Sequence, residues 1–160
     1  MKILGLADVE VPAVYNPHIK KRFRDIELVI SCGDLPPAYL EFVVSMLDRP
    51  LYYVHGNHVQ KIRDDEGNIH TEPPGAINLH ENIFYDEKND LILAGIEGSL
   101  IYNFGPYQYS QKRMWKMVYG LVPRLMMNKI TYGRYLDIFV THAPSAGIHD
   151  EDDPAHQGVD

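Results

Sequence analysis

The chain has one cysteine, Cys32, among its 160 residues, so it cannot form an internal disulfide, and a reducing compartment fits this usage. No apolar stretch approaches the roughly 18 residues that a membrane-spanning helix needs. The N-terminus also lacks the charged, apolar and small-residue succession of a signal peptide. Together these absences predict a cytoplasmic protein with no membrane partner.

Basic residues are few: 15 Lys and Arg stand against 22 Asp and Glu, which gives a formal net charge of −7 at pH 7. Nonspecific nucleic-acid binding relies on a basic face, so this composition disfavours it. A nuclease with a specific site stays open, because bound metal ions supply local positive charge.

Apolar residues are present in ordinary proportion, 45% of the chain, and predict one globular domain over residues 1–160. Residues 36–47 and about 111–131 read as helices, the second kinked or divided by Pro123, and residues 17–23 as a short basic helix or loop. Residues 59–78 have little apolar surface and read as a long loop. Strands are expected over residues 2–7, 26–31, 51–55 and 135–141, with a hairpin over 82–99 that turns near 88–90.

Polar residues that suit a metal ion stand at the ends of four of these apolar runs. Asp8 and Asp34 follow the first two, Asn57 with His58 follows the third, and His142 follows the last. Ligands of open α/β sheets gather where the carboxyl ends of the strands meet. Two carboxylates, an amide oxygen and an imidazole at one edge would form a binuclear metal site, which is typical of metal-assisted hydrolysis.

Each of these residues has an expected part in such a site. Asp34 is the best candidate to bridge two ions about 3.5–4 Å apart, which could share a hydroxide that attacks phosphorus. Asp8, Asn57 and His142 complete the ligands, a mixed oxygen and nitrogen set that suits Mn, Fe, Zn or Co better than Ca. His58 would lie near the metals and, when protonated, would stabilise charge or donate to the leaving oxygen.

A simpler structural role is open for each residue taken singly. Asp8 and Asp34 could cap turns, Asn57 could be a left-handed turn residue, and His142 could be a polar end to a strand. The presence of potential metal ligands at all four strand ends favours the metal site over four separate structural roles. Cys32 is more typical of a small buried residue than of a nucleophile, because no histidine-based triad accompanies it.

The ordered set of motifs resembles the calcineurin-like metallophosphoesterases. The matches are Asp8, Gly33-Asp34, Gly56-Asn57-His58 and Thr141-His142. The resemblance covers nearly the whole chain and implies an α/β, α+β-type sandwich of two mixed β-sheets flanked by helices. It also implies two divalent ions, with Asp8 on the first, Asp34 bridging, Asn57 and His142 on the second, and His58 as catalytic acid or charge stabiliser.

Three positions depart from the family pattern. Glu10 stands where the family has the histidine of Asp-x-His, and could offer an oxygen to the first metal. Val59 replaces the acidic residue that follows Gly-Asn-His and orients the histidine. The closing Gly-His-x-His is missing, so we expect a truncated domain whose residues 143–160 form a flexible tail. His149 or His156 could substitute for the missing ligands, and the open sheet edge could bring two copies together.

The function implied is hydrolysis of a phosphomonoester or phosphodiester by a metal-bridging hydroxide. The alternative is a catalytically degenerate scaffold or binding protein of the same fold, which Glu10, Val59 and the missing motif favour. Arg63 and Tyr107, in segments that could line the site, are candidates to bind the phosphate of a small-molecule ester.

Overall fold

The computed structural model describes residues 1–58, 62–63, 67 and 69–147, and within them it shows a mixed α/β fold with three helices. The helices are α1 (Ile19–Arg22), α2 (Pro37–Leu47) and α3 (Gln111–Tyr132). None of the described helices is both long enough and apolar enough to cross a membrane. The strands are β1 (Ile3–Leu6), β2 (Leu28–Ser31), β3 (Leu51–Tyr53), β4 (Ile62–Arg63), β5 (Ile69–His70), β6 (Ile77–Asn78), β7 (Asn82–Asp86), β8 (Leu91–Ile96), β9 (Ser99–Leu100), β10 (Gln108–Tyr109) and β11 (Ile138–Thr141).

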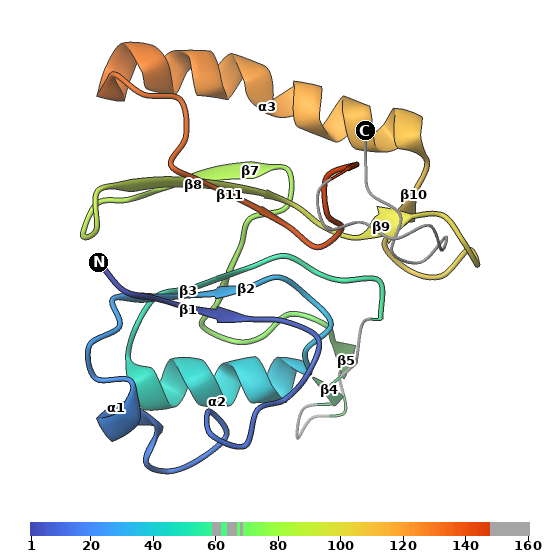
Figure 1. Cartoon of the computed structure of the whole chain (residues 1–160). Helices are drawn as coiled ribbons and strands as arrows, with labels where there is room; N and C mark the ends of the chain where they lie inside the picture. The colour runs from blue at the N-terminus through green and yellow to red at the C-terminus, as the bar shows by residue number, and fades with distance from the viewer. Residues whose placement is uncertain (59–61, 64–66, 68, 148–160) are drawn as a thin grey trace.

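Two sheets are stacked face to face and helices cover both outer faces, as Figure 1 shows. The first sheet has the strand order β1-β2-β3-β6 and carries α1 and α2 on its outer face. The second has the order β11-β8-β7 and carries α3. Two short pairs, β9 with β10 and β4 with β5, stand beside these sheets.

All pairings of the first sheet are parallel in the part of the chain that is described, whereas the second sheet is mixed. The expectation of two mixed sheets is therefore wrong for the first sheet. The physical reason is that β1, β2 and β3 are linked by crossovers through the segments containing α1 and α2, and such connections join parallel strands.

Three apolar clusters fill the three spaces between the layers. Because successive side chains of a strand point to opposite faces, Val29 packs towards α2, whereas Leu28 and Ile30 face the second sheet. In β8, Leu93 faces the first sheet and Ala94 packs under α3. Burial on both faces explains the continuous apolar runs of β2, β3 and β8, whereas β1 and β11 are partly exposed.

The helices begin and end where the sequence signals them. Pro37 occupies the first turn of α2, and Asp48 ends that helix in the left-handed conformation with φ of 53°. Ser110 caps α3 by accepting a hydrogen bond from the backbone N–H of Arg113, and Gly133 ends the helix with φ of 74°. Pro123 lies inside α3, which continues as one helix. Of the two expected effects of Pro123, division of the helix is wrong, and a kink stays a prediction.

Most other expected elements are confirmed within one to three residues at each end. The hairpin turns between β7 and β8, where Asp86 accepts hydrogen bonds from both the backbone and side chain of Asn89. The long loop predicted over residues 59–78 instead contributes β4, β5 and β6. These strands are only two residues long, too short to leave an apolar periodicity in the sequence.

Candidate metal centre

Four of the predicted ligands meet at one edge of the sandwich. Asp8 follows β1, Asp34 follows β2 and Asn57 follows β3, and since these strands are parallel, their carboxyl ends lie at the same edge. His142 follows β11 in the second sheet and reaches the same place. One ligand atom from each of Asp8, Asp34 and His142 lies within 4.8 Å of the others, a spacing that could hold a metal ion.

Two glycines allow the turns after β2 and β3 to approach one another. A Cβ atom on Gly33 would lie 2.5 Å from the backbone nitrogen of Gly56 and 2.8 Å from Nδ1 of His142. A Cβ on Gly56 would collide with the carboxylate of Asp34. The absence of side chains at these positions is therefore what brings Asp34 against the turn that carries Asn57.

Both candidate aspartates have left-handed backbone conformations, with φ of 59° at Asp8 and 57° at Asp34. Such angles are uncommon outside glycine, although aspartate tolerates them better than most residues, and strained positions cluster at functional sites. The left-handed turn lets Oδ1 of Asp34 accept a hydrogen bond of 2.8 Å from the backbone N–H of His58. This bond holds the carboxylate with its other oxygen, Oδ2, 3.5 Å from His142.

The imidazole of His142 is held with its Nε2 atom towards other ligand atoms. Its Nδ1 lies 2.8 Å from the carbonyl oxygen of Cys32, and because a carbonyl only accepts, Nδ1 carries the proton of the neutral ring. Nε2 then presents a lone pair, yet it faces Oδ1 of Asn57 at 2.9 Å and Oδ2 of Asp34 at 3.5 Å. In the neutral ring these three acceptors repel one another, and either a proton on Nε2 or a metal ion among them removes the repulsion. The donor set therefore suits a divalent metal.

Tyr102 fixes the orientation of Asn57. The Nδ2 group of Asn57 donates a hydrogen bond of 2.7 Å to the hydroxyl of Tyr102, and this leaves Oδ1 pointing at His142. The same hydroxyl lies 3.3 Å from Nε2 of His58. Tyr102 therefore connects a candidate metal ligand to the candidate catalytic histidine.

These side chains line one open cleft. Asp8 and His58 are exposed at its surface, whereas Asn57 is 7% exposed and lies at its base. The cleft is lined by Asp8, Asp34, Asn57, His58, Ser99, His142, Ala143 and Pro144. A ligand bound there would reach both the possible metal position and His58.

Cys32 lies under the site and contributes to it through its backbone. Its carbonyl accepts from His142, while burial, and then the negative charge of Asp8, raise the pKa of its thiol. A thiol held in the neutral form is a weak nucleophile, which agrees with the expectation that Cys32 is not catalytic.

Of the other predicted site residues, Glu10 and Tyr107 lie outside the cluster of candidate metal ligands. Glu10 is exposed, and its carboxylate is not one of the described ligand atoms that converge. The pKa of Tyr39 is raised first by burial of Tyr39 and then by the negative charge of Glu10. Tyr107 stacks its ring on His55 with centroids 4.8 Å apart and does not line the cleft. The side chain of Arg63 and both His149 and His156 lie outside the described part of the structure, as does most of the tail predicted over 143–160.

Tyr102 and Ser99 line or support the site but were not predicted from the sequence. The connection that contains Tyr102 was recognised as a possible lining of the site, with Tyr107 as its candidate residue. Nothing in the local pattern separates these two tyrosines, because their contacts are made by residues 45 and 52 positions away, Asn57 for Tyr102 and His55 for Tyr107. Ser99 lies three residues after the end of β8, and this place near a strand end could have indicated that it lines the site.

No protein-family model matches this chain, and a search of the curated proteins finds no match either. The candidate metal centre therefore rests on its own geometry and chemistry.

Proposed function

We propose that this protein is a metal-dependent phosphohydrolase with a metallophosphoesterase-like fold that hydrolyses a phosphomonoester or phosphodiester. The observation that carries the proposal is the convergence of Oδ2 of Asp34 and Oδ1 of Asn57 on Nε2 of His142. Carboxylate, amide and imidazole ligands together suit Mn, Fe, Zn or Co.

In such a site some residues would bind the metal ions and others would orient these ligands. Asp34, Asn57 and His142 would hold one ion, and Asp8 with Asp34 would hold a second. When bound, these ions supply Lewis acidity that activates water and neutralises charge on a phosphoryl group. The chain orients that set: the Tyr102 hydroxyl turns the amide of Asn57, and the backbone N–H of His58 fixes the carboxylate of Asp34.

His58 is proposed as the residue that moves a proton. It is exposed on the cleft and lies 3.3 Å from the hydroxyl of Tyr102. In the protonated form His58 would donate towards the leaving oxygen of the substrate. Tyr102 takes the place of the acidic partner that the sequence lacks at Val59, because its hydroxyl can orient the imidazole.

The test is hydrolysis of bis-p-nitrophenyl phosphate and of p-nitrophenyl phosphate with Mn²⁺. We expect turnover of at least one compound that EDTA abolishes and that Asp34→Asn reduces by at least about 100-fold. The matched control is Asp25→Asn, which should keep full activity. Asp25 is exposed and precedes β2, whereas Asp34 follows that strand. Activity that survives EDTA or the Asp34 substitution would contradict the proposal.

A degenerate scaffold is the second candidate, and the position of Glu10 favours it. Because Glu10 stays outside the cluster, the first ion would have only Asp8 and Asp34 as ligands from the described residues. The two candidates differ in metal content after incubation with Mn²⁺ and desalting. About two ions per chain would support the enzyme, and none in a folded protein would support the scaffold.

Localisation in the cytoplasm belongs to the same proposal. It is supported by the single cysteine, since cytosolic proteins keep their thiols reduced.

We also propose that two copies of the chain pair through a sheet edge. Among the described strands, β11 forms one edge of the second sheet, and its Phe139 is exposed.

A further inference from the structure

The helix α3 has apolar residues on two sides. Met114, Met117 and Leu121 are buried against the second sheet. On the outer side, Tyr119 is 63% exposed and Ile130 is 79% exposed. An amphipathic surface helix normally turns charged and polar residues to this side, so the outer apolar surface calls for an explanation.

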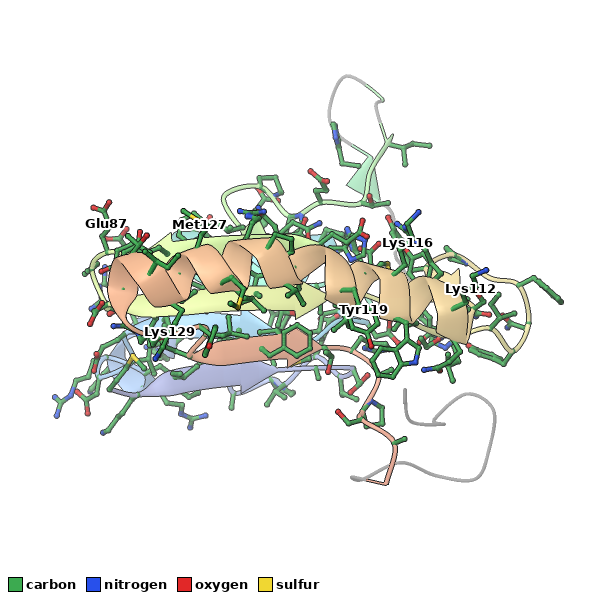
Figure 2. The ribbon with its side chains drawn as sticks, turned by 90° about the horizontal axis from the view of Figure 1, so that it is seen from above. Glu87, Lys112, Lys116, Tyr119, Met127 and Lys129 are labelled. Carbon is green, nitrogen blue, oxygen red and sulfur yellow. The ribbon has the colours of Figure 1, made fainter. Side chains whose placement is uncertain are left out.

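The exposed apolar residues share one face of the helix. Tyr119, Met126 and Ile130 are spaced by seven and four residues, which places them one above another. Met127 lies beside them and is 59% exposed. We call this surface the outer face of α3, and Figure 2 looks down onto it.

Basic residues accompany this face. In a chain of net charge −7, α3 carries five basic residues and no acidic one: Lys112, Arg113, Lys116, Arg124 and Lys129. Lys112 and Lys116 precede Tyr119 by seven and three residues, so they continue the outer face towards the start of the helix. Arg113 is turned aside and pairs with Glu81 at 3.2 Å. Glu87, in the turn after β7, is the acidic residue labelled beside the opposite end of α3 in Figure 2.

We propose that the outer face of α3 binds the surface of a membrane that contains anionic phospholipid. Lys112 and Lys116 would contact lipid phosphates, and Tyr119, Met127 and Ile130 would enter the boundary between headgroups and acyl chains. A basic helix with large apolar side chains is suited to this surface. The earlier expectation of no membrane partner rested on the lack of a spanning segment, which a helix lying on the surface does not need.

Other partners fit the outer face less well. Parallel packing of two copies of α3 would bring Lys112 and Lys116 of both chains together, which opposes that form of self-association. Nucleic-acid binding uses basic residues with aromatic rings for stacking, and it gives no role to exposed Met126, Met127 and Ile130. Among the described residues, α3 is the outermost layer on its side of the molecule (Figure 1).

Trp115 supplies a probe within the chain. It is the only tryptophan, it is 39% exposed, and its ring stacks on Tyr119 with centroids 5.3 Å apart. Transfer of Tyr119 into lipid would carry the Trp115 indole into a less polar environment. We therefore expect a blue shift of its fluorescence when the protein binds vesicles.

The experiment is flotation of the full chain with two kinds of vesicle, phosphatidylcholine alone and phosphatidylcholine with about one third phosphatidylglycerol. Binding should require the anionic lipid and weaken with salt. Lys112→Glu/Lys116→Glu and, separately, Met127→Ser/Ile130→Ser should each lower the partition coefficient at least about tenfold. Lys20→Glu/Lys21→Glu makes the same charge change on exposed residues of α1, on the opposite side of the molecule, and should bind like the wild type (Figure 1).

Several outcomes would overturn the proposal. These are no binding to anionic vesicles, equal binding to both kinds, or an equal loss in the α1 variant. Tighter binding to poly(U) than to vesicles, with Met127→Ser/Ile130→Ser unchanged, would assign the face to nucleic acid instead. Circular dichroism of each variant separates a lost surface from a lost fold, and the substituted side chains are exposed, so folding should be retained.

Discussion

Nε2 of His142 lies 2.9 Å from Oδ1 of Asn57, while Nδ1 of the same ring donates to the carbonyl of Cys32. In the neutral ring, these two contacts leave the lone pair of Nε2 facing an amide oxygen. A side-chain carboxylate of Asp34 approaches the same nitrogen at 3.5 Å. Such a set of acceptors would be stabilised by a cation, and this relationship is the basis of the first prediction.

Mn²⁺ should raise the free energy of unfolding of the wild type, because an ion that binds the folded chain alone stabilises it by mass action. At an ion concentration 100 times the dissociation constant the gain is about 2.7 kcal/mol. His142→Ala should lose most of this gain. His18→Ala, which removes an exposed histidine in the loop before α1, should keep it. Urea denaturation with Mn²⁺ and with EDTA measures both, and an equal gain in the two variants would contradict the metal centre.

Tyr102→Phe should weaken metal binding and any hydrolysis by about 10-fold or more, since residues that orient metal ligands commonly have effects of this size. Without the hydroxyl, the Nδ2 group of Asn57 loses its acceptor at 2.7 Å and the amide can rotate. The free energy of unfolding should fall by only about 0.5–1.5 kcal/mol. Metal titration and urea denaturation measure the two effects.

The control for Tyr102 is Tyr135→Phe, since Tyr135 is 48% exposed and follows α3, away from the described cleft. It should change neither metal affinity nor hydrolysis. A Tyr102→Phe protein with unaltered metal affinity and activity would show that the hydroxyl does not position Asn57.

The positions of β2, β3 and β8 could be predicted because burial on both faces leaves an unbroken apolar run. Val29 and Ile30 face different layers of the sandwich, and both are buried. The polar residue that follows each run then falls at the sheet edge for geometric reasons. This is why Asp8, Asp34 and His142 could be expected at one place before any contact was known.

The supporting contacts could not be predicted, because they join residues far apart in the sequence. The bond from Asn57 to Tyr102 spans 45 residues, and local patterns carry no record of it. The sequence also left open whether Pro123 kinks or divides α3, and the structure has one continuous helix. The helix is retained because apolar residues before and after Pro123, Leu121 and Leu125, pack on the second sheet, so tertiary contacts outweigh the cost of proline.

Gly56→Ala should destabilise the protein by several kcal/mol and abolish metal binding. The new Cβ would occupy the space of the Asp34 carboxylate, and it would also lie 2.8 Å from the backbone nitrogen of Asp34. Neither group can move without breaking the turn that presents the ligands. Thermal denaturation and metal titration would measure the two losses.

Gly120→Ala is the matched control for this steric argument. Gly120 lies within α3, and apart from its chain neighbours and the nearby backbone of the helix itself, no described atom lies within 4 Å of the position that its Cβ would take. Alanine favours the helix over glycine, so this variant should gain about 0.5–1 kcal/mol of unfolding free energy. If both glycine variants lost stability equally, the close approach at Gly56 would not be the cause.

The partly buried His80 and the buried Glu97 form a pair whose contribution to stability depends on pH. Nδ1 of His80 accepts from the backbone N–H of Glu97 at 3.2 Å, so the proton of the neutral ring is on Nε2, 3.2 Å from Oε1 of Glu97. The Tyr109 hydroxyl donates to the same oxygen at 2.6 Å. Burial lowers the pKa of His80 and raises the pKa of Glu97, so folding shifts the protonation equilibrium of each group towards its neutral form.

The pH dependence of unfolding should therefore have opposite signs at the two groups. The stability supplied by neutral His80 is present above its ordinary pKa of 6.5 and is lost as the pH falls through the lower folded value. The stability from neutral Glu97 is present below its ordinary pKa of 4.5 and is lost as the pH rises through the higher folded value. Urea denaturation of His80→Gln between about pH 7 and 5 should lack the first loss. Glu97→Gln, which keeps an oxygen for Tyr109, should lack the second, and curves parallel to the wild type would contradict both assignments.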